Sequence, residues 1–254
     1  MAFLELQDIS VSFSGFLAVD QVSLQIDKGE TRVIIGPNGA GKTTIIDMIT
    51  GKTSPTKGKI VLDGADITGQ GPHQIAGRHK VGRKFQGPNL FDYLTVYENI
   101  EVALAGHSSV LKTFLYRKNK AIAEEIEVIL KQINLYEKQN VISTSLSHGE
   151  RQWLEMGMVI AQKPQLITLD EPTAGMTADE TYKTGELIKT LMKDKTVIVV
   201  EHDIDFVEQI AEKVTVLHQG KLLAEGSFAE VKRNPKVVQV YLKDDDDEEG
   251  DLYA

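Results

Sequence analysis

Short runs of apolar, often β-branched residues alternate with amphipathic stretches along most of this 254-residue chain. The runs that predict strands lie at 22–26, 31–35, 59–62, 166–169, 196–200 and 214–217. The stretches that predict helices lie at 42–50, 179–192 and 203–213. Strands that alternate with helices in this way favour an α/β fold, in which helices flank a parallel sheet.

The middle of the chain has a different pattern. Ile122, Ile126, Ile129, Leu130 and Ile133 recur at helical spacing, and charged residues stand between them. This pattern predicts a helical segment at about 88–162, inserted in an α/β domain that spans residues 1–243.

Composition and charge exclude several classes of protein. The chain has no cysteine, which excludes disulfides, cysteine–zinc sites, iron–sulfur clusters and thiol catalysis. Seven of its 37 acidic residues lie in 244–254, a segment without a basic residue, and the other 30 nearly balance the 28 Lys and Arg. We therefore expect an acidic, solvated and disordered tail, and no basic surface for a nucleic-acid partner.

A glycine-rich segment follows the apolar run at 31–35 and precedes the predicted helix at 42–50. It reads Gly36, Pro37, Asn38, Gly39, Ala40, Gly41, Lys42, Thr43 and Thr44, which fits the pattern G-x-x-x-x-G-K-[ST]. Glycines let backbone N–H groups approach phosphate oxygens, and the helix N-terminus adds unpaired N–H groups. Lys42 would place an ammonium on the outer phosphates, and Thr43 would offer a hydroxyl to Mg²⁺. The sequence therefore predicts a nucleotide phosphate site.

Two carboxylates, Asp170 and Glu171, end the apolar run at 166–169. At the carboxyl edge of a parallel sheet they would lie beside the phosphate loop. Because neighbouring strand residues point to opposite faces, the two acids should have different roles. We expect Asp170 to support Mg²⁺ through water and Glu171 to polarise the water that attacks the γ-phosphate.

A third segment, Leu146 to Glu150, precedes a helical run. Ser147 and Glu150 fit the capping box S-x-x-E, so these residues could simply begin a helix. Alternatively, the Ser147 hydroxyl and the Gly149 N–H could bind an anion at the exposed helix start.

With these three segments in this order, the chain resembles the ATP-binding subunits of ABC transporters over about residues 3–242. The resemblance implies a P-loop NTPase fold with a mixed or parallel sheet core, an antiparallel β subdomain and the helical insert. It implies that Phe13 stacks on adenine, that Gln86 senses Mg²⁺ and the γ-phosphate, and that His202 contacts the γ-phosphate. The signature of the family, Leu-Ser-Gly-Gly-Gln, corresponds to Leu146, Ser147, His148, Gly149 and Glu150.

Two segments depart from the family pattern. His148 and Glu150 replace glycine and glutamine of the signature, but the family's main phosphate contacts match Ser147 and Gly149, so binding should survive. Thr177 stands where many relatives have aspartate, which weakens any inference of communication across a dimer through this loop.

The resemblance also extends to a branch of the family. Segments 82–86, 147–155, 174–177 and 234–242 are similar to the ATPases of branched-chain amino acid importers, and most similar to those of urea importers. The expected function is therefore ATP hydrolysis that powers an importer of urea, with a branched-chain amino acid importer as the alternative.

The resemblance further implies cofactors, partners and location. ATP and Mg²⁺ would bind between the phosphate loop of one ATPase and the signature of a second, either another copy or a homologous chain. Two permease subunits would hold the protein at the cytoplasmic face of the membrane and connect it indirectly to a periplasmic substrate-binding protein. Segment 89–97 carries aromatic residues that could dock to a permease or pack in the core.

Three other functions fit the sequence less well. A soluble ABC ATPase of translation or DNA repair usually has two such domains or a long coiled coil, and neither occurs here. Glu171 and His202 argue against a catalytically silent module. A GTPase would need Asn-Lys-x-Asp, and segment 119–122 lacks the final aspartate.

Overall fold

The computed structural model describes residues 2–84, 89–106 and 120–240. Gln86 and the acidic tail 244–254, for which the sequence makes predictions, lie outside the described residues. Within the described ranges, no helix is both long and apolar enough to cross a membrane.

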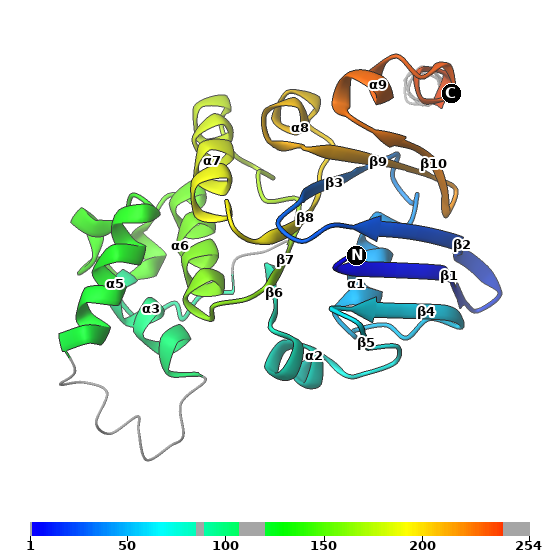
Figure 1. Cartoon of the computed structure of the whole chain (residues 1–254). Helices are drawn as coiled ribbons and strands as arrows, with labels where there is room; N and C mark the ends of the chain where they lie inside the picture. Colours follow the sequence, from blue (N-terminus) through cyan, green and yellow to red (C-terminus); the bar gives the residue numbers. More distant parts are fainter. Residues whose placement is uncertain (1, 85–88, 107–119, 241–254) are drawn as a thin grey trace.

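A six-stranded sheet forms the centre of the molecule, with strand order β10-β9-β3-β8-β7-β6 (Figure 1). Its strands are β3 (Thr31–Ile35), β6 (Val81–Lys84), β7 (Leu166–Asp170), β8 (Thr196–Val200), β9 (Lys213–His218) and β10 (Lys221–Gly226). Neighbouring strands of this sheet are parallel, except that β10 pairs antiparallel with β9. The predicted α/β fold with a largely parallel sheet is confirmed.

A smaller antiparallel sheet, in the order β2-β1-β4-β5, lies beside the central one. Its strands are β1 (Leu4–Phe13), β2 (Phe16–Ile26), β4 (Lys57–Leu62) and β5 (Ala65–Asp66). Helix α1 (Lys42–Ile49) shares one apolar core with both sheets, since Ile45 and Ile46 are buried with Leu6 of β1 and Ile198 of β8. The helix that begins at the glycine-rich loop is therefore held from two sides.

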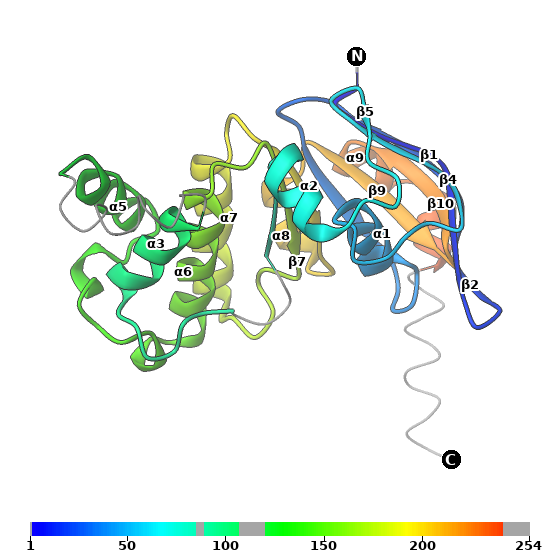
Figure 2. The same cartoon turned by 90° about the horizontal axis from the view of Figure 1, so that it is seen from below.

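Helix α2 (Pro72–His79) lies on the same side of the central sheet as α1, since Ile75 is buried in the core that they share. The remaining helices cover the other face of the sheet and extend away from it. They are α3 (Val96–Ala105), α5 (Lys120–Gln132), α6 (His148–Ala161), α7 (Ala178–Leu191), α8 (Ile204–Ile210) and α9 (Phe228–Lys232). Helices α3 and α5 lie at the end of the molecule remote from the antiparallel sheet (Figures 1 and 2). Ile126, Ile129 and Leu130 of α5 are buried, as their helical spacing predicts.

One predicted helix is shorter than expected. The prediction for 203–213 extends too far, because α8 ends at Ile210 and Lys213 already belongs to β9. The backbone at Ala211 is extended, and the N–H of Glu212 donates to the carbonyl of Thr31 at 3.1 Å. Pairing with β3 therefore takes over from helix formation at this point.

A buried arginine joins the two sheets. Arg32 of β3 is fully buried, and its guanidinium donates to the carbonyl of Gln25 in β2 at 3.0 Å. It also pairs with Glu30 and Glu225, each at 2.6 Å, and donates to the Thr215 hydroxyl at 2.9 Å. A buried cation is tolerated only where such partners replace its hydration.

We predict that Arg32→Met lowers the free energy of unfolding by about 3 kcal/mol, because it leaves the buried carboxylate of Glu30 without its closest cation. Urea unfolding followed by circular dichroism measures the change. The control is Lys183→Met, which removes an exposed ion pair with Asp179 and should cost less than about 1 kcal/mol. Equal losses in the two variants would contradict the prediction.

Candidate functional site

The glycine-rich loop 36–41 connects β3 to α1 and can be formed only with glycine at two points. Gly36 has φ of 149°, and a Cβ there would lie 2.2 Å from the carbonyl oxygen of Leu217. Gly41 has φ of 98°, and a Cβ there would lie 2.8 Å from the carbonyl oxygen of Ala18. The loop is thus pressed against the backbone of β9 and β2, in the strand–loop–helix context that a phosphate site requires.

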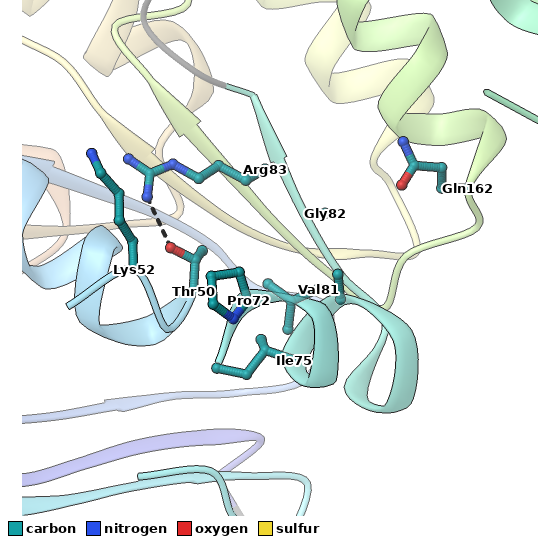
Figure 3. Close-up of a pocket in the computed structure, with 9 residues that line it drawn as sticks. Thr50, Lys52, Pro72, Ile75, Val81, Gly82, Arg83 and Gln162 are labelled. Carbon is teal, nitrogen blue, oxygen red and sulfur yellow. Dashed lines mark hydrogen bonds between the residues drawn. The ribbon is translucent and has the colours of Figure 1, made fainter. Parts of the chain in front are cut away.

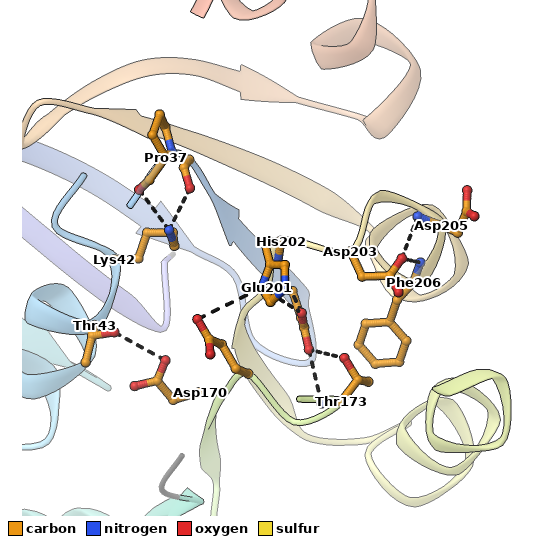
Figure 4. Close-up of polar contacts among 12 residues, drawn as sticks. Pro37, Lys42, Thr43, Asp170, Thr173, Glu201, His202, Asp203, Asp205 and Phe206 are labelled. Atoms are coloured by element: carbon orange, nitrogen blue, oxygen red, sulfur yellow. Dashed lines mark hydrogen bonds and ion pairs between the residues drawn. The ribbon is translucent and has the colours of Figure 1, made fainter. Parts of the chain in front are cut away.

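Lys42 opens helix α1 and bends back over the loop (Figure 4). Its Nζ donates to the carbonyl oxygens of Gly36 at 2.6 Å and Pro37 at 2.9 Å. Burial lowers the pKa of the ammonium, and the carboxylates of Glu171 and Asp170 act in the opposite direction. The cation is therefore held at the loop, where it can meet a phosphate.

A cavity of about 290 Å³ opens above the loop. It is lined by Phe13, Phe16, Ala18, Asn38, Gly39, Ala40, Gly41, Lys42, Thr43, Thr44 and Glu171. Phe13 is half exposed and pairs in register with Phe16, so two aromatic rings border the cavity. The sequence analysis predicted Phe13 and missed Phe16, although the Ser14-Gly15 turn between them could have indicated that they face each other.

Thr43 and Asp170 meet at the other side of the loop. The Thr43 hydroxyl donates to Asp170 Oδ1 at 3.3 Å, and Asp170 Oδ2 lies 3.8 Å from a guanidinium nitrogen of Arg83. Burial raises the pKa of Asp170, the neighbouring Glu171 adds to this effect, and Arg83 and Thr43 oppose it. The sequence analysis missed Arg83, which comes from the neighbouring parallel strand β6.

The donor set suits Mg²⁺, since a hydroxyl and a carboxylate supply hard oxygen ligands. In the ranges that the structure describes, no group of three or more His, Cys, Asp or Glu side chains could hold a metal ion. Most ligands of a metal at this site would therefore be water and phosphate oxygens, as Mg²⁺ usually has. Gln86, the other predicted metal residue, lies outside the described residues.

Glu171 follows Asp170 with a left-handed backbone, at φ of 46°. Its N–H donates to the carbonyl of Val200 at 2.9 Å, and its Oε1 lies 4.0 Å from Nδ1 of His202. Asp170 contacts Thr43 while Glu171 lies near His202, so the two acids have separate surroundings. Because Glu171 lies beyond the end of β7, its left-handed backbone sets its direction, and the expected alternation of side chains along a strand does not apply to it.

Glu201 is a buried residue that connects two parts of the site. It is fully buried and accepts from the Thr173 hydroxyl at 2.6 Å, the Thr173 N–H at 3.2 Å and the His202 N–H at 3.1 Å (Figure 4). It thereby connects the turn after Glu171 to the residue that carries the imidazole. The one sequence signal for Glu201 is its place, a carboxylate directly between an apolar strand and His202.

The signature segment begins helix α6, as the capping-box alternative predicted. The Ser147 hydroxyl accepts from the Glu150 N–H at 3.3 Å, and Glu150 accepts from the Ser147 N–H at 3.1 Å. His148 contacts the carbonyl of Ala174 through Nε2 at 2.9 Å. Among the described residues, no hydrogen bond joins the signature to the phosphate loop of the same chain.

A carboxylate that the sequence analysis missed lies beside the signature. Glu180 of α7 contacts the Ser147 hydroxyl at 3.5 Å, and a Cβ on Gly149 would lie 2.6 Å from it. The same carboxylate accepts from the N–H and hydroxyl of Thr177, both at 3.0 Å. Thr177, which departs from the family pattern, thus caps α7 and shares Glu180 with the signature.

The aromatic residues of segment 89–97 divide into two groups. Tyr93 is 93% exposed and Phe91 is 48% exposed, whereas Tyr97 packs against the core. The two exposed rings are available to a partner, and Tyr97 is a core residue.

Comparison with known proteins bears on the family. The ABC transporter family model matches residues 19–174, and a model of the branched-chain amino acid ATP-binding cassette transporter matches residues 221–242. The chain is 36% identical over 248 residues to the high-affinity branched-chain amino acid transport ATP-binding proteins BraF of Pseudomonas aeruginosa and LivG of Escherichia coli. Each of these alignments covers 94% of this chain and 97% of the relative.

Solved structures agree with this result. A nucleotide-free ATP-binding cassette from an ABC transporter superposes with a TM-score of 0.82 at 29% identity, covering 95% of this chain and 99% of the other. A dimeric ATP-binding cassette in a post-hydrolysis state, bound to ADP and phosphate, superposes with a TM-score of 0.75 at 27% identity, covering 89% and 98%.

The sequence matches and the superpositions agree over nearly the whole chain. The family model includes the phosphate loop at 36–43, and the superposed structures share the fold around the central sheet. The chain therefore belongs to the ABC transporter family, as an ATP-binding importer subunit of the branched-chain amino acid type, whose ATP hydrolysis is coupled to transport.

Proposed function

We propose that this chain powers the import of branched-chain amino acids, by binding and hydrolysing ATP at the site around Lys42, Asp170 and Glu171. The observation that carries the proposed ATP hydrolysis is the convergence of the phosphate loop, Thr43 with Asp170, and Glu171 with His202 around one edge of the sheet.

The phosphate loop and its lysine have the role of holding the triphosphate. Backbone N–H groups of residues 36–41 and the start of α1 face the phosphates, and the ammonium of Lys42 neutralises the outer ones. Phe13, with Phe16 beside it, provides an apolar surface for the adenine ring.

Thr43 and Asp170 are the described residues that would hold Mg²⁺, with Gln86 as a further ligand. The metal, when bound, neutralises charge on the outer phosphates. Asp170 acts through water, in keeping with a carboxylate that already accepts a hydrogen bond from Thr43.

Glu171 and His202 have complementary roles at the γ-phosphate. Glu171 orients and polarises the attacking water, and His202 donates a hydrogen bond to the phosphate as charge develops on it. Glu201 fixes the positions of Glu171 and His202 relative to each other, through its hydrogen bonds to Thr173 and to the His202 N–H.

The signature acts on the nucleotide of a second ATPase subunit. The start of helix α6 offers the Ser147 hydroxyl and the Gly149 N–H to an anion, with His148 and Glu150 at its border. The γ-phosphate would then join two subunits, and hydrolysis would release them. A relative's ATP-binding cassette is dimeric with ADP and phosphate bound, which supports the proposal of a second ATPase subunit. The second subunit is a homologous chain, or another copy when the protein is isolated.

Two permease subunits are the proposed membrane partners. ATP-binding subunits of importers work with permeases, and the exposed Phe91 and Tyr93 give this chain an apolar contact surface next to the segment that carries Gln86. The protein would thus be peripheral, on the cytoplasmic face of the membrane, and a periplasmic substrate-binding protein would act on it only indirectly.

The substrate assignment depends on the relatives. BraF and LivG are named as branched-chain amino acid transport proteins, and the C-terminal match at 221–242 is to a transporter of the same type. These findings support branched-chain amino acids as the substrate over urea, which the sequence segments had favoured.

For the catalytic role, we predict that Glu171→Gln lowers ATP turnover by at least about 100-fold, because an amide cannot polarise the attacking water. ATP affinity should change by less than about threefold, since the shape of the site is kept. Phosphate release and equilibrium binding of labelled ATP measure the two quantities. Glu137→Gln on the exposed surface is the control, and unchanged turnover in Glu171→Gln would remove this residue from its role.

For the phosphate site, we expect Lys42→Ala to weaken ATP binding by about tenfold or more, because it removes a charged hydrogen-bond donor from the outer phosphates. Isothermal titration of the variant with ATP tests this. Lys52→Ala, at an exposed lysine beyond the end of α1, should keep the affinity of the unmodified protein. Equal affinities in all three proteins would contradict the phosphate-loop assignment.

For the substrate, a strain without the gene should lose uptake of labelled leucine, isoleucine and valine. The unmodified gene should restore uptake and the Glu171→Gln gene should not. Urea uptake, measured in the same strains, should remain unchanged. Restoration of urea uptake without leucine uptake would reverse the assignment.

A further inference from the structure

Arg83 lies between the metal site and the end of helix α1. It belongs to β6, the strand that precedes Gln86, and it is almost fully buried. One guanidinium nitrogen lies 2.6 Å from Asp47 Oδ1. The same nitrogen donates to the Thr50 hydroxyl at 2.8 Å (Figure 3). Another lies 3.8 Å from Asp170 Oδ2.

The contacts of Arg83 complete a ring of four side chains. Thr43 and Asp47 stand one turn apart on α1, so they share a face of the helix. Thr43 donates to one oxygen of Asp170, and Arg83 approaches the other. The carboxylate of Asp170 is therefore held at both oxygens, from α1 on one side and from β6 on the other.

The charges in the ring favour this arrangement. Asp170 is buried, and a guanidinium nitrogen of Arg83 lies 3.8 Å from its Oδ2. Asp47 offsets part of the charge of Arg83 at 2.6 Å, which limits the repulsion between the guanidinium and a nearby Mg²⁺. A planar guanidinium can serve two carboxylates and a hydroxyl together, which a single ammonium cannot do as well.

We propose that Arg83 is a positioning residue for Mg²⁺, which acts by keeping the carboxylate of Asp170 directed toward Thr43. This inference rests on the proposed function, since it assigns Mg²⁺ to Thr43 and Asp170. Partners that orient the ligands of a metal typically contribute 10- to 100-fold to its affinity.

Arg83 also connects the metal site to the surface. Together with Thr50, Lys52, Ile75, Val81 and Gln162, it lines a cavity of about 320 Å³ (Figure 3). Lys52 lies at the exposed end of the same network, with its Nζ 3.2 Å from Asp47 Oδ2. Lys52→Met therefore provides a control that alters the network without touching Asp170.

The test separates metal binding from folding and from ATP binding. Arg83→Gln and Lys52→Met are each made in the Glu171→Gln background, so that ATP stays intact. ATP affinity is first measured in the presence of a chelator. Protein in excess over ATP is then titrated with Mn²⁺, a stand-in for Mg²⁺ whose electron paramagnetic resonance signal reports binding.

We expect Arg83→Gln to weaken Mn²⁺ binding by about tenfold. Metal-free ATP affinity should change by less than twofold, and Lys52→Met should behave as the background protein. A purely structural brace on α1 would instead lower metal-free ATP affinity and Mn²⁺ affinity together, and that result would overturn the proposal. Unchanged Mn²⁺ affinity would overturn it as well.

Arg83→Lys is the second variant, for the case that Gln at this buried position prevents folding. It keeps the positive charge but cannot reach Asp47 and Asp170 together, so Mn²⁺ affinity should fall by at least about threefold. An affinity equal to that of the background would count against the proposal. If the Glu171→Gln protein itself fails to bind ATP without metal, the proposed function fails instead.

Discussion

The packing of helix α1 between the two sheets holds the site together. Ile45 and Ile46 are buried against strands of both sheets, so the helix cannot shift relative to either. The backbone carbonyls of Ala18 and Leu217 press on the loop that precedes the helix, and only glycine fits at Gly41 and Gly36. The apolar core thereby fixes the position of the loop 36–41, whose backbone N–H groups can bind phosphate.

Buried charge follows from this arrangement. The carboxyl ends of β3, β6, β7 and β8 lie at one edge of the sheet, and the ionisable residues there lose much of their hydration. Each is compensated by a neighbour from another element: Asp170 by Arg83, Glu201 by Thr173, and Lys84 by Glu155 at 3.7 Å. Pairs of this kind stabilise little on their own, but they orient the groups that they join.

The prediction from sequence was strongest where chemistry is local. The loop at 36–43 needs its glycines, lysine and threonine in a fixed order, and the apolar runs at 31–35 and 196–200 need burial on both faces. Arg83 and Glu180 were missed because each becomes informative through a partner far away in the chain, Asp170 and Ser147 respectively. Phe16 and Glu201 were missed although each had a local signal, the turn before Phe16 and the position of Glu201 next to His202. The comparisons favour the branched-chain alternative over urea, and the residues that touch ATP carry no information about the transported molecule.

The sequence by itself determined the α/β class, the phosphate loop and the order of the motifs, because hydrophobic periodicity and glycine spacing act over a few residues. The tertiary structure decided where helix α8 ends, since pairing with β3 competes with the helix at Glu212. It also decided which carboxylate faces Thr43 and which faces His202. Such choices depend on strands that are remote in sequence and adjacent in space, and no local pattern records that adjacency.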